Sequence, residues 1–112
     1  MLRVADLECA ANFYRLLGLE FVKHAHGSGP EHYACEMPGF VLELYPATAE
    51  QPVSASTRLG FSVAEVDDLV AKLAAAGSKT LSAPRDSEWG RRAVVIDPDG
   101  HRVELLENRE TA

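Results

Sequence analysis

Residues 39–44 read Gly39-Phe40-Val41-Leu42-Glu43-Leu44, and residues 100–105 read Gly100-His101-Arg102-Val103-Glu104-Leu105. The second stretch repeats the glycine, the glutamate and the final leucine of the first at a shift of 61 residues, from 39 to 100. Residues 4–7 (Val-Ala-Asp-Leu) likewise match residues 63–66 (Val-Ala-Glu-Val), at a shift of 59 residues, from 4 to 63. Since the matches occur in the same order in both halves, we infer an internal duplication of about 50 residues.

The first half predicts one helix, preceded by one strand and followed by three. Apolar residues between Leu7 and Leu17 recur at helical spacing, Asp6 is a good N-cap, and Gly18 can adopt the left-handed conformation that ends a helix. Turns that contain Gly and Pro separate the strands. The predicted strands are Leu2–Val4, Glu20–His26, Glu31–Met37 and Phe40–Tyr45.

The second half predicts the same order of elements. A helix over Val66–Ala76 ends before Gly77, and the Asp99-Gly100 turn between two apolar runs is typical of a β-hairpin. We expect an irregular loop through Asp86–Gly90. The predicted strands are Arg58–Val63, a weak strand at Lys79–Ser82, Arg92–Asp97 and His101–Glu107.

These elements predict an α+β fold made of two βαβββ modules in one chain. The first module covers residues 1–45 and the second residues 57–107, with a linker at 46–56 and a short tail at 108–112. The linker is rich in Ala, Ser, Thr, Gln and Pro. We treat the 112 residues as a single domain, since chains of this length ordinarily form one.

The composition favours a compact globular protein of the cytoplasm. The chain has 11 Lys and Arg against 17 Asp and Glu, and the resulting net charge of −6 argues against non-specific binding to nucleic acid. No uncharged apolar run approaches the about 18 residues that a membrane span needs, and the start lacks the apolar stretch of a signal peptide. Two cysteines are too few for a disulfide scaffold.

Four stretches of the chain resemble the vicinal oxygen chelate superfamily, which includes glyoxalases, extradiol dioxygenases and bleomycin-resistance proteins. They are residues 4–7, residues 13–19 (Phe-Tyr-Arg-Leu-Leu-Gly-Leu), residues 59–63 (Leu-Gly-Phe-Ser-Val) and residues 97–105 (Asp-Pro-Asp-Gly-His-Arg-Val-Glu-Leu), so the resemblance spans nearly the whole chain. It implies strands that curl into a curved, cup-like mixed sheet around a small molecule, and it implies a homodimer. Fold alone does not settle the activity, because one fold hosts unrelated chemistries.

The resemblance also implies a set of metal-binding positions. In the metal-dependent members, a His or Gln on the first strand and a Glu on the last strand of each module bind a divalent ion. The two glutamates are present here as Glu43 and Glu104, but the first-strand position of the second module is Arg58, and its counterpart in the first module would precede Met1. A guanidinium has no lone pair to donate. We therefore expect no cofactor; if a metal is present, Glu43 and Glu104 are its expected ligands.

The candidate ligand-binding residues are those that the resemblance and the strand patterns place in the cup. An apolar pocket with a few polar groups is typical of small-molecule sites. If the family geometry holds, Arg58 replaces the metal as the positive centre beside Glu43 and Glu104, which would otherwise repel each other. Trp89 either roofs the pocket or covers its edge. The full set is Glu43, Arg58, Glu104, His32, Tyr33 and Trp89.

Other roles stay open for several residues. Glu104 can form an ordinary surface pair with a neighbouring arginine, and Arg58 can be a solvated residue at the start of a strand. His24 and His26 share a strand face and are close enough to chelate a metal, although no third ligand follows at a diagnostic spacing. His101 follows a turn, and we expect it to be exposed.

Three functions are compatible with these features. The first is a metal-free protein that binds an apolar or aromatic small molecule, similar to the drug-sequestering branch of the superfamily. The second is a divalent-metal-dependent lyase, isomerase or dioxygenase with a degenerate or truncated metal site. The third is a dimeric module without a ligand. We favour the first, with a small-molecule partner, no nucleic-acid or membrane partner, and a homodimer.

Overall fold

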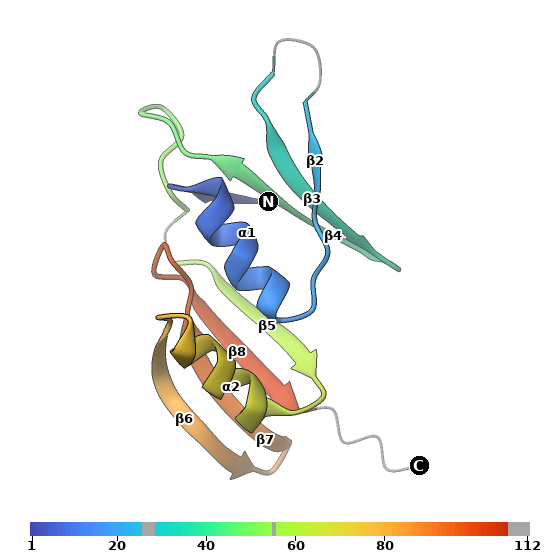
Figure 1. Cartoon of the computed structure of the whole chain (residues 1–112), viewed down its shortest axis with the longest axis vertical. Coiled ribbons are helices and arrows are strands. Elements are labelled where there is room, and N and C mark those ends of the chain that lie inside the picture. The colour runs from blue at the N-terminus through green and yellow to red at the C-terminus, as the bar shows by residue number, and fades with distance from the viewer. Residues whose placement is uncertain (26–28, 55, 108–112) are drawn as a thin grey trace. The chain divides into compact units, whose positions relative to one another are not determined.

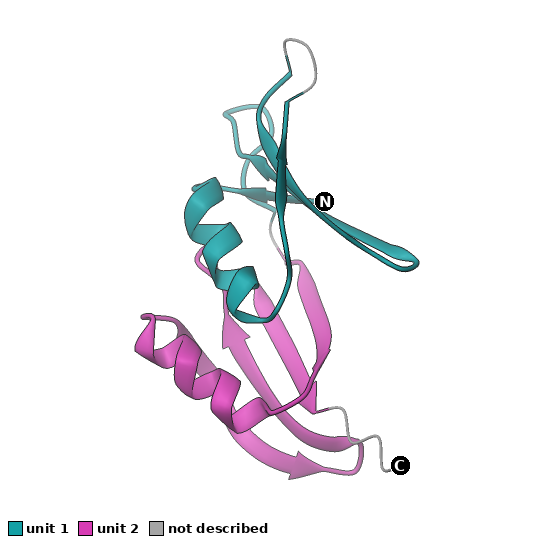
Figure 2. Ribbon diagram, turned by 45° about the vertical axis from the view of Figure 1, so that its right-hand side comes forward, with its two compact units in different colours: residues 1–55 teal, residues 56–112 magenta. Residues whose placement is uncertain are grey.

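The computed structural model of the chain describes residues 1–25, 29–54 and 56–107, and the chain divides into two compact units. Unit 1 comprises residues 1–55 and unit 2 residues 56–112. Each unit has a four-stranded mixed sheet and one helix, which confirms the α+β class and the βαβββ order (Figure 1, Figure 2). The expected tail at 108–112 lies outside the described residues. Neither helix is long and apolar enough to cross a membrane.

In unit 1 the strands lie in the order β1-β4-β3-β2, with β1 parallel to β4 and the other pairs antiparallel. The Asp6 side chain accepts a hydrogen bond from the backbone N–H of Cys9 at 3.0 Å, so the predicted N-cap starts the helix. The strand predicted at Glu20–His26 is shorter than expected, and His26 lies outside the described residues. The elements are β1 (Leu2–Val4), α1 (Leu7–Leu16), β2 (Val22–His24), β3 (His32–Met37) and β4 (Phe40–Pro46).

In unit 2 the order is β5-β8-β7-β6, again with one parallel pair, β5 and β8. Glu65 occupies the N-cap position of the helix without a side-chain hydrogen bond there. Instead the Glu107 carboxylate accepts from the backbone N–H of Val66 at 3.0 Å, which ties the helix to the last strand. The elements are β5 (Arg58–Val63), α2 (Val66–Ala75), β6 (Lys79–Ser87), β7 (Gly90–Ile96) and β8 (Arg102–Glu107).

The strand β6 corrects two predictions. It runs from Lys79 through Ser87, so the weak strand at Lys79–Ser82 is too short and the loop through Asp86–Gly90 is reduced to a tight turn. Its pairing with β7 shifts register twice, and it contains Pro84. A proline and such irregularities are tolerated because β6 lies at the edge of its sheet, where one side of the backbone has no partner strand in the described unit.

Each helix covers one face of its own sheet, which we call the helix face; the other is the helix-free face. In unit 1, Leu42 and Leu44 of β4 are 3 % and 0 % exposed on the helix face. In unit 2, Val103 and Leu105 of β8 are fully buried in the same way. Because side chains alternate along a strand, Glu43 and Glu104 point to the helix-free faces.

Candidate functional site

The contact between Arg91 and the helix shows which side chains of β7 point to which face of the sheet in unit 2. Its guanidinium donates two hydrogen bonds to Asp67 of α2, Nε to Oδ2 at 3.0 Å and Nη2 to Oδ1 at 2.9 Å. These bonds hold the pKa of Asp67 below its usual value and place Arg91 on the helix face. The next residue, Arg92, therefore points to the helix-free face, as does Glu104, whose register partner is Val94.

Glu104 lies between two guanidinium groups. Arg92 donates from Nη2 to its Oε2 at 3.0 Å, and the Nη2 of Arg58 lies 4.0 Å from the same oxygen. The Arg92 and Glu104 side chains are 22 % and 37 % exposed, whereas that of Arg58 is 59 % exposed. Arg92 is thus the principal partner of this carboxylate and Arg58 a looser one. The sequence reasoning missed Arg92, although it lies at a register position diagonal to Glu104.

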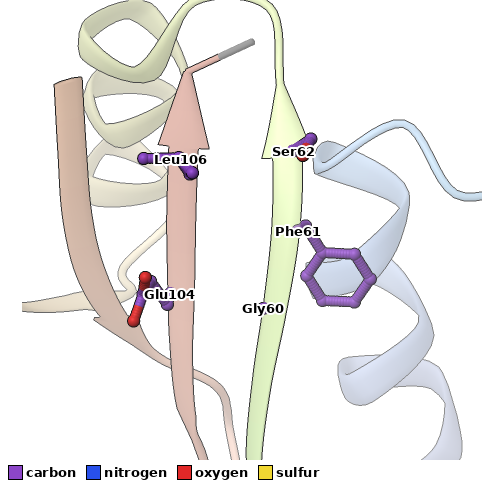
Figure 3. A pocket seen from close by; sticks show the side chains of 5 residues that line it. All are labelled: Gly60, Phe61, Ser62, Glu104 and Leu106. Carbon is purple, nitrogen blue, oxygen red and sulfur yellow. The ribbon is translucent and has the colours of Figure 1, made fainter. Parts of the chain in front are cut away.

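A pocket of about 160 Å³ lies beside this carboxylate (Figure 3). Gly60 leaves room in it, since a Cβ atom placed on this residue would meet nothing within 4 Å. Trp89 is 68 % exposed in the turn after β6 and is not among the lining residues. The lining residues are Gly60, Phe61, Ser62, Glu104 and Leu106. The pocket therefore combines an apolar surface with one carboxylate. Glu104 lines it, whereas Arg58 and Trp89 do not.

In unit 1 the helix-free face carries a row of stacked planar groups. The rings of His32 and Tyr45 stack with centroids 4.3 Å apart and an angle of 10°, and the guanidinium carbon of Arg3 lies 5.0 Å from the Tyr45 centroid. The His24 ring continues the row, 5.7 Å from His32. The Nε2 atom of His32 lies 3.9 Å from Oε2 of Glu43. The structure thus brings two predicted site residues, His32 and Glu43, together.

Tyr33 does not join them, because neighbouring residues on a strand point to opposite faces. Its hydroxyl donates to the Glu8 carboxylate of α1, and the guanidinium of Arg15 lies 5.2 Å from its ring centroid. The residue is 6 % exposed on the helix face. Tyr33 therefore packs against α1, on the face opposite to His32 and Glu43. The hypothesis that His24 and His26 together chelate a metal involves His26, which lies outside the described residues.

The prediction that His101 is exposed is wrong, because this residue is only 3 % exposed. Asp97 organises the turn that it follows: Oδ1 accepts from the backbone N–H of Asp99 at 2.9 Å and of His101 at 2.8 Å. Oδ2 lies 2.7 Å from Nδ1 of the imidazole. The possible ligand atoms of Asp97, Asp99 and His101 lie within 4.8 Å of one another, so their chemistry would suit a divalent ion. In this arrangement both Asp97 oxygens instead brace the turn.

Comparison with known proteins identifies the family to which this chain belongs. The chain belongs to the Glyoxalase/Bleomycin resistance protein/Dioxygenase superfamily, whose family model matches residues 1–105. It is 30 % identical to a probable lactoylglutathione lyase of Vibrio parahaemolyticus, with all of this chain and 90 % of the relative aligned.

Two solved structures extend the comparison. A glyoxalase-related enzyme from Fulvimarina pelagi is 32 % identical with a TM-score of 0.74, covering 96 % of this chain and 84 % of that one. TnmS3, an antibiotic-binding protein from Streptomyces sp. CB03234, is 26 % identical with a TM-score of 0.71, covering 95 % and 89 %. These matches confirm the family resemblance stated from the sequence.

The residues of unit 2 do not fit the divalent-metal centre that the resemblance implies. The family resemblance assigns Arg58 to the position of an imidazole or amide ligand, and a guanidinium has no lone pair to donate. One oxygen of Glu104 already accepts from Arg92, so a metal would have to displace a charge-assisted hydrogen bond. Two positive guanidinium groups beside the carboxylate also repel a divalent cation.

Proposed function

We propose that this protein binds a small organic molecule without using the divalent-metal centre of its metal-dependent relatives. The observation that carries the proposal is the engagement of Glu104 by Arg92 and Arg58, which neutralises a carboxylate at a family metal position. The pocket over Gly60, with its mainly apolar lining and one charged group, has the composition of a small-molecule site. A fold neighbour named as an antibiotic-binding protein supports the same class of function.

In this proposal each predicted residue has a defined role. Leu106 supplies apolar contact area in the pocket, and Glu104 accepts hydrogen bonds from the ligand with the oxygen that Arg92 does not use. Arg58, which is mostly exposed, contacts the ligand from the start of β5.

Further parts of the proposal concern unit 1 and the protein as a whole. Glu43 and His32 are proposed as further ligand contacts on the helix-free face of unit 1. Trp89 remains a proposed contact whose exposed ring would pack on a ligand. The homodimer and the cytoplasmic location stay predictions; light scattering of the purified chain at micromolar concentration tests the first.

A divalent-metal-dependent lyase is the second candidate, favoured by the name of the Vibrio parahaemolyticus relative, a probable lactoylglutathione lyase. Such an activity would draw on Glu43, or on the cluster of Asp97, Asp99 and His101, for metal ligands. The two candidates differ in one measurable property. A metal-dependent enzyme is stabilised by its ion through mass action, whereas a protein without a metal site is not.

The test is a thermal-shift series with Ni²⁺, Zn²⁺ and Mn²⁺, together with elemental analysis of the purified protein. We expect the wild type to be indifferent to all three ions. Arg58→His should gain stabilisation, because it adds an imidazole ligand beside Glu104 and removes a positive charge. Arg15→His, which adds the same kind of ligand at an exposed position of α1, is the matched control and should gain no stabilisation. Stoichiometric metal in the wild type would favour the lyase.

A further inference from the structure

Basic side chains gather on the helix-free face of unit 2. Register partners in a sheet share a face, and the pairs Arg58 with Arg102, Ile96 with Arg102, and Ile96 with Lys79 form one row across the four strands. A second row contains Arg85, which pairs with Arg92. The basic patch therefore consists of Arg58, Lys79, Arg85, Arg92 and Arg102.

One carboxylate faces this basic patch. Among the strand residues that the structure describes in unit 2, Glu104 is the single acidic residue on the helix-free face. Asp86 pairs with Arg91 and Glu107 binds the start of α2, so both belong to the helix face. Five positive charges thus meet one negative charge on a face of a chain whose net charge is −6. The patch is not a consequence of the overall composition.

Within the basic patch, Arg58 and Arg102 are register partners on adjacent strands. The two residues are directly opposite on neighbouring strands, which lie about 4.8 Å apart, and like charges in that position destabilise a sheet. Arg58 reaches Glu104 only at 4.0 Å, and Arg92 holds the same oxygen more closely. Arg102 is exposed and forms no ion pair with a residue in the described part of the chain. An anion between the two guanidinium groups would remove their repulsion.

We infer that the helix-free face of unit 2 binds the anionic group of a small organic molecule, a carboxylate or a phosphate, between Arg58 and Arg102. This inference rests on the proposed function, since it names the chemistry of the ligand at the same face. Guanidinium groups bind both kinds of anion through pairs of parallel hydrogen bonds. The uncharged part of the molecule then lies in the pocket over Gly60, one register row further along the same two strands.

A small anion fits this face better than a nucleic acid does. The patch is confined to one face of one four-stranded sheet, whereas the chain as a whole carries a net charge of −6. A long polyanion would be repelled by the rest of such a chain, while a small molecule meets only the local field. The apolar pocket beside the patch also suits an organic body next to the charged group.

The test compares probes of the same shape and different charge on the full chain by isothermal titration calorimetry. The probes are naphthoate, naphthyl phosphate and the neutral naphthamide. We expect the better anionic probe to bind about tenfold more tightly than naphthamide at low salt, and the difference to shrink as salt screens the charges. Whether naphthoate or naphthyl phosphate binds more tightly distinguishes the two sources of the anion.

Substitutions of single basic residues test whether the preference for anionic probes depends on Arg102. Arg102→Gln should abolish the preference for anions and leave the affinity for naphthamide unchanged, whereas Arg102→Lys, which keeps the charge and loses the planar fork, should retain part of it. Lys72→Gln, on the exposed side of α2, makes the same change in charge and should alter neither affinity.

The outcomes separate the two proposals. Equal binding of neutral and anionic probes in the wild type would overturn the anion site while leaving the small-molecule function standing. Absence of binding by all three probes would overturn both. Tighter binding of a single-stranded oligonucleotide than of naphthyl phosphate, lost in Arg102→Gln, would overturn the assignment to a small molecule.

Discussion

Replacing Arg92 by Gln tests the central interaction of the site, because it removes the principal donor to Glu104. Two unit charges 3.0 Å apart interact with about 5.5 kcal/mol at an effective dielectric constant of about 20. Solvent reaches both partners, with 37 % of Glu104 and 22 % of Arg92 exposed, and desolvation offsets more of the attraction. We therefore expect Arg92→Gln to lower the free energy of unfolding by about 1–2 kcal/mol.

Arg58 provides the matched comparison on the same carboxylate. Its contact is longer, 4.0 Å, and its side chain is 59 % exposed, so Arg58→Gln should cost about 0.5 kcal/mol or less. Relief of its repulsion with Arg102 reduces that cost further. The order of the two effects follows directly from the geometry, since both arginines address the same oxygen of Glu104.

Urea unfolding at neutral pH, followed by far-ultraviolet circular dichroism, measures both variants. A double-mutant cycle with Glu104→Gln isolates the pair, and we expect a coupling energy of about 1 kcal/mol between Arg92 and Glu104. If Arg92→Gln costs as much in the Glu104→Gln background as in the wild type, the ion pair is not what the arginine contributes. A larger cost for Arg58→Gln than for Arg92→Gln would refute the assignment of the principal partner.

Three further predictions concern contacts within each unit. Tyr33→Phe removes the hydrogen bond between β3 and α1 and should cost about 1 kcal/mol in urea unfolding. Asp97→Ala leaves buried donors of the turn, including the backbone N–H of His101, without their acceptor, and should cost about 3 kcal/mol in the same assay. Hydrogen bonding to Arg91 lowers the pKa of Asp67 below 3.8, so its stabilisation is present above that pH and lost below it. The thermal midpoints of wild type and Asp67→Asn should therefore differ near neutral pH and converge in acid.

Local signals in the sequence predicted most of the fold. The helix that starts after Asp6 and the strand Arg58–Val63 have the expected starts, because capping and the alternation of apolar residues act within a few residues. The full length of β6 could not be predicted in this way. Pro84 argues against a strand locally, and only its place at the sheet edge makes it acceptable.

The candidate site was less accessible to prediction, for a similar reason. The alternation of side chains along a strand places His32 and Tyr33 on opposite faces of the sheet, which the sequence pattern alone already indicates. The burial of His101 and the pairing of Arg92 with Glu104 depend on a turn conformation and on the register between strands. Such contacts join residues that no local periodicity connects, and a single sequence does not specify them.

The internal duplication includes the residues beside the two glutamates as well as the glutamates themselves. Glu43 and Glu104 are 61 residues apart, and the basic residues beside them, His32 and Arg92, are 60 apart, so each module places a nitrogen-bearing side chain beside its own glutamate. The two modules differ in the chemistry of that side chain. A neutral imidazole nitrogen has a lone pair that can accept a hydrogen bond or bind a metal, whereas a guanidinium has none. The helix-free face of unit 1 can therefore supply a metal ligand beside its glutamate, whereas Arg92 cannot do so in unit 2. If a metal stabilises this protein, we expect Glu43→Gln to reduce that stabilisation more than Glu104→Gln does.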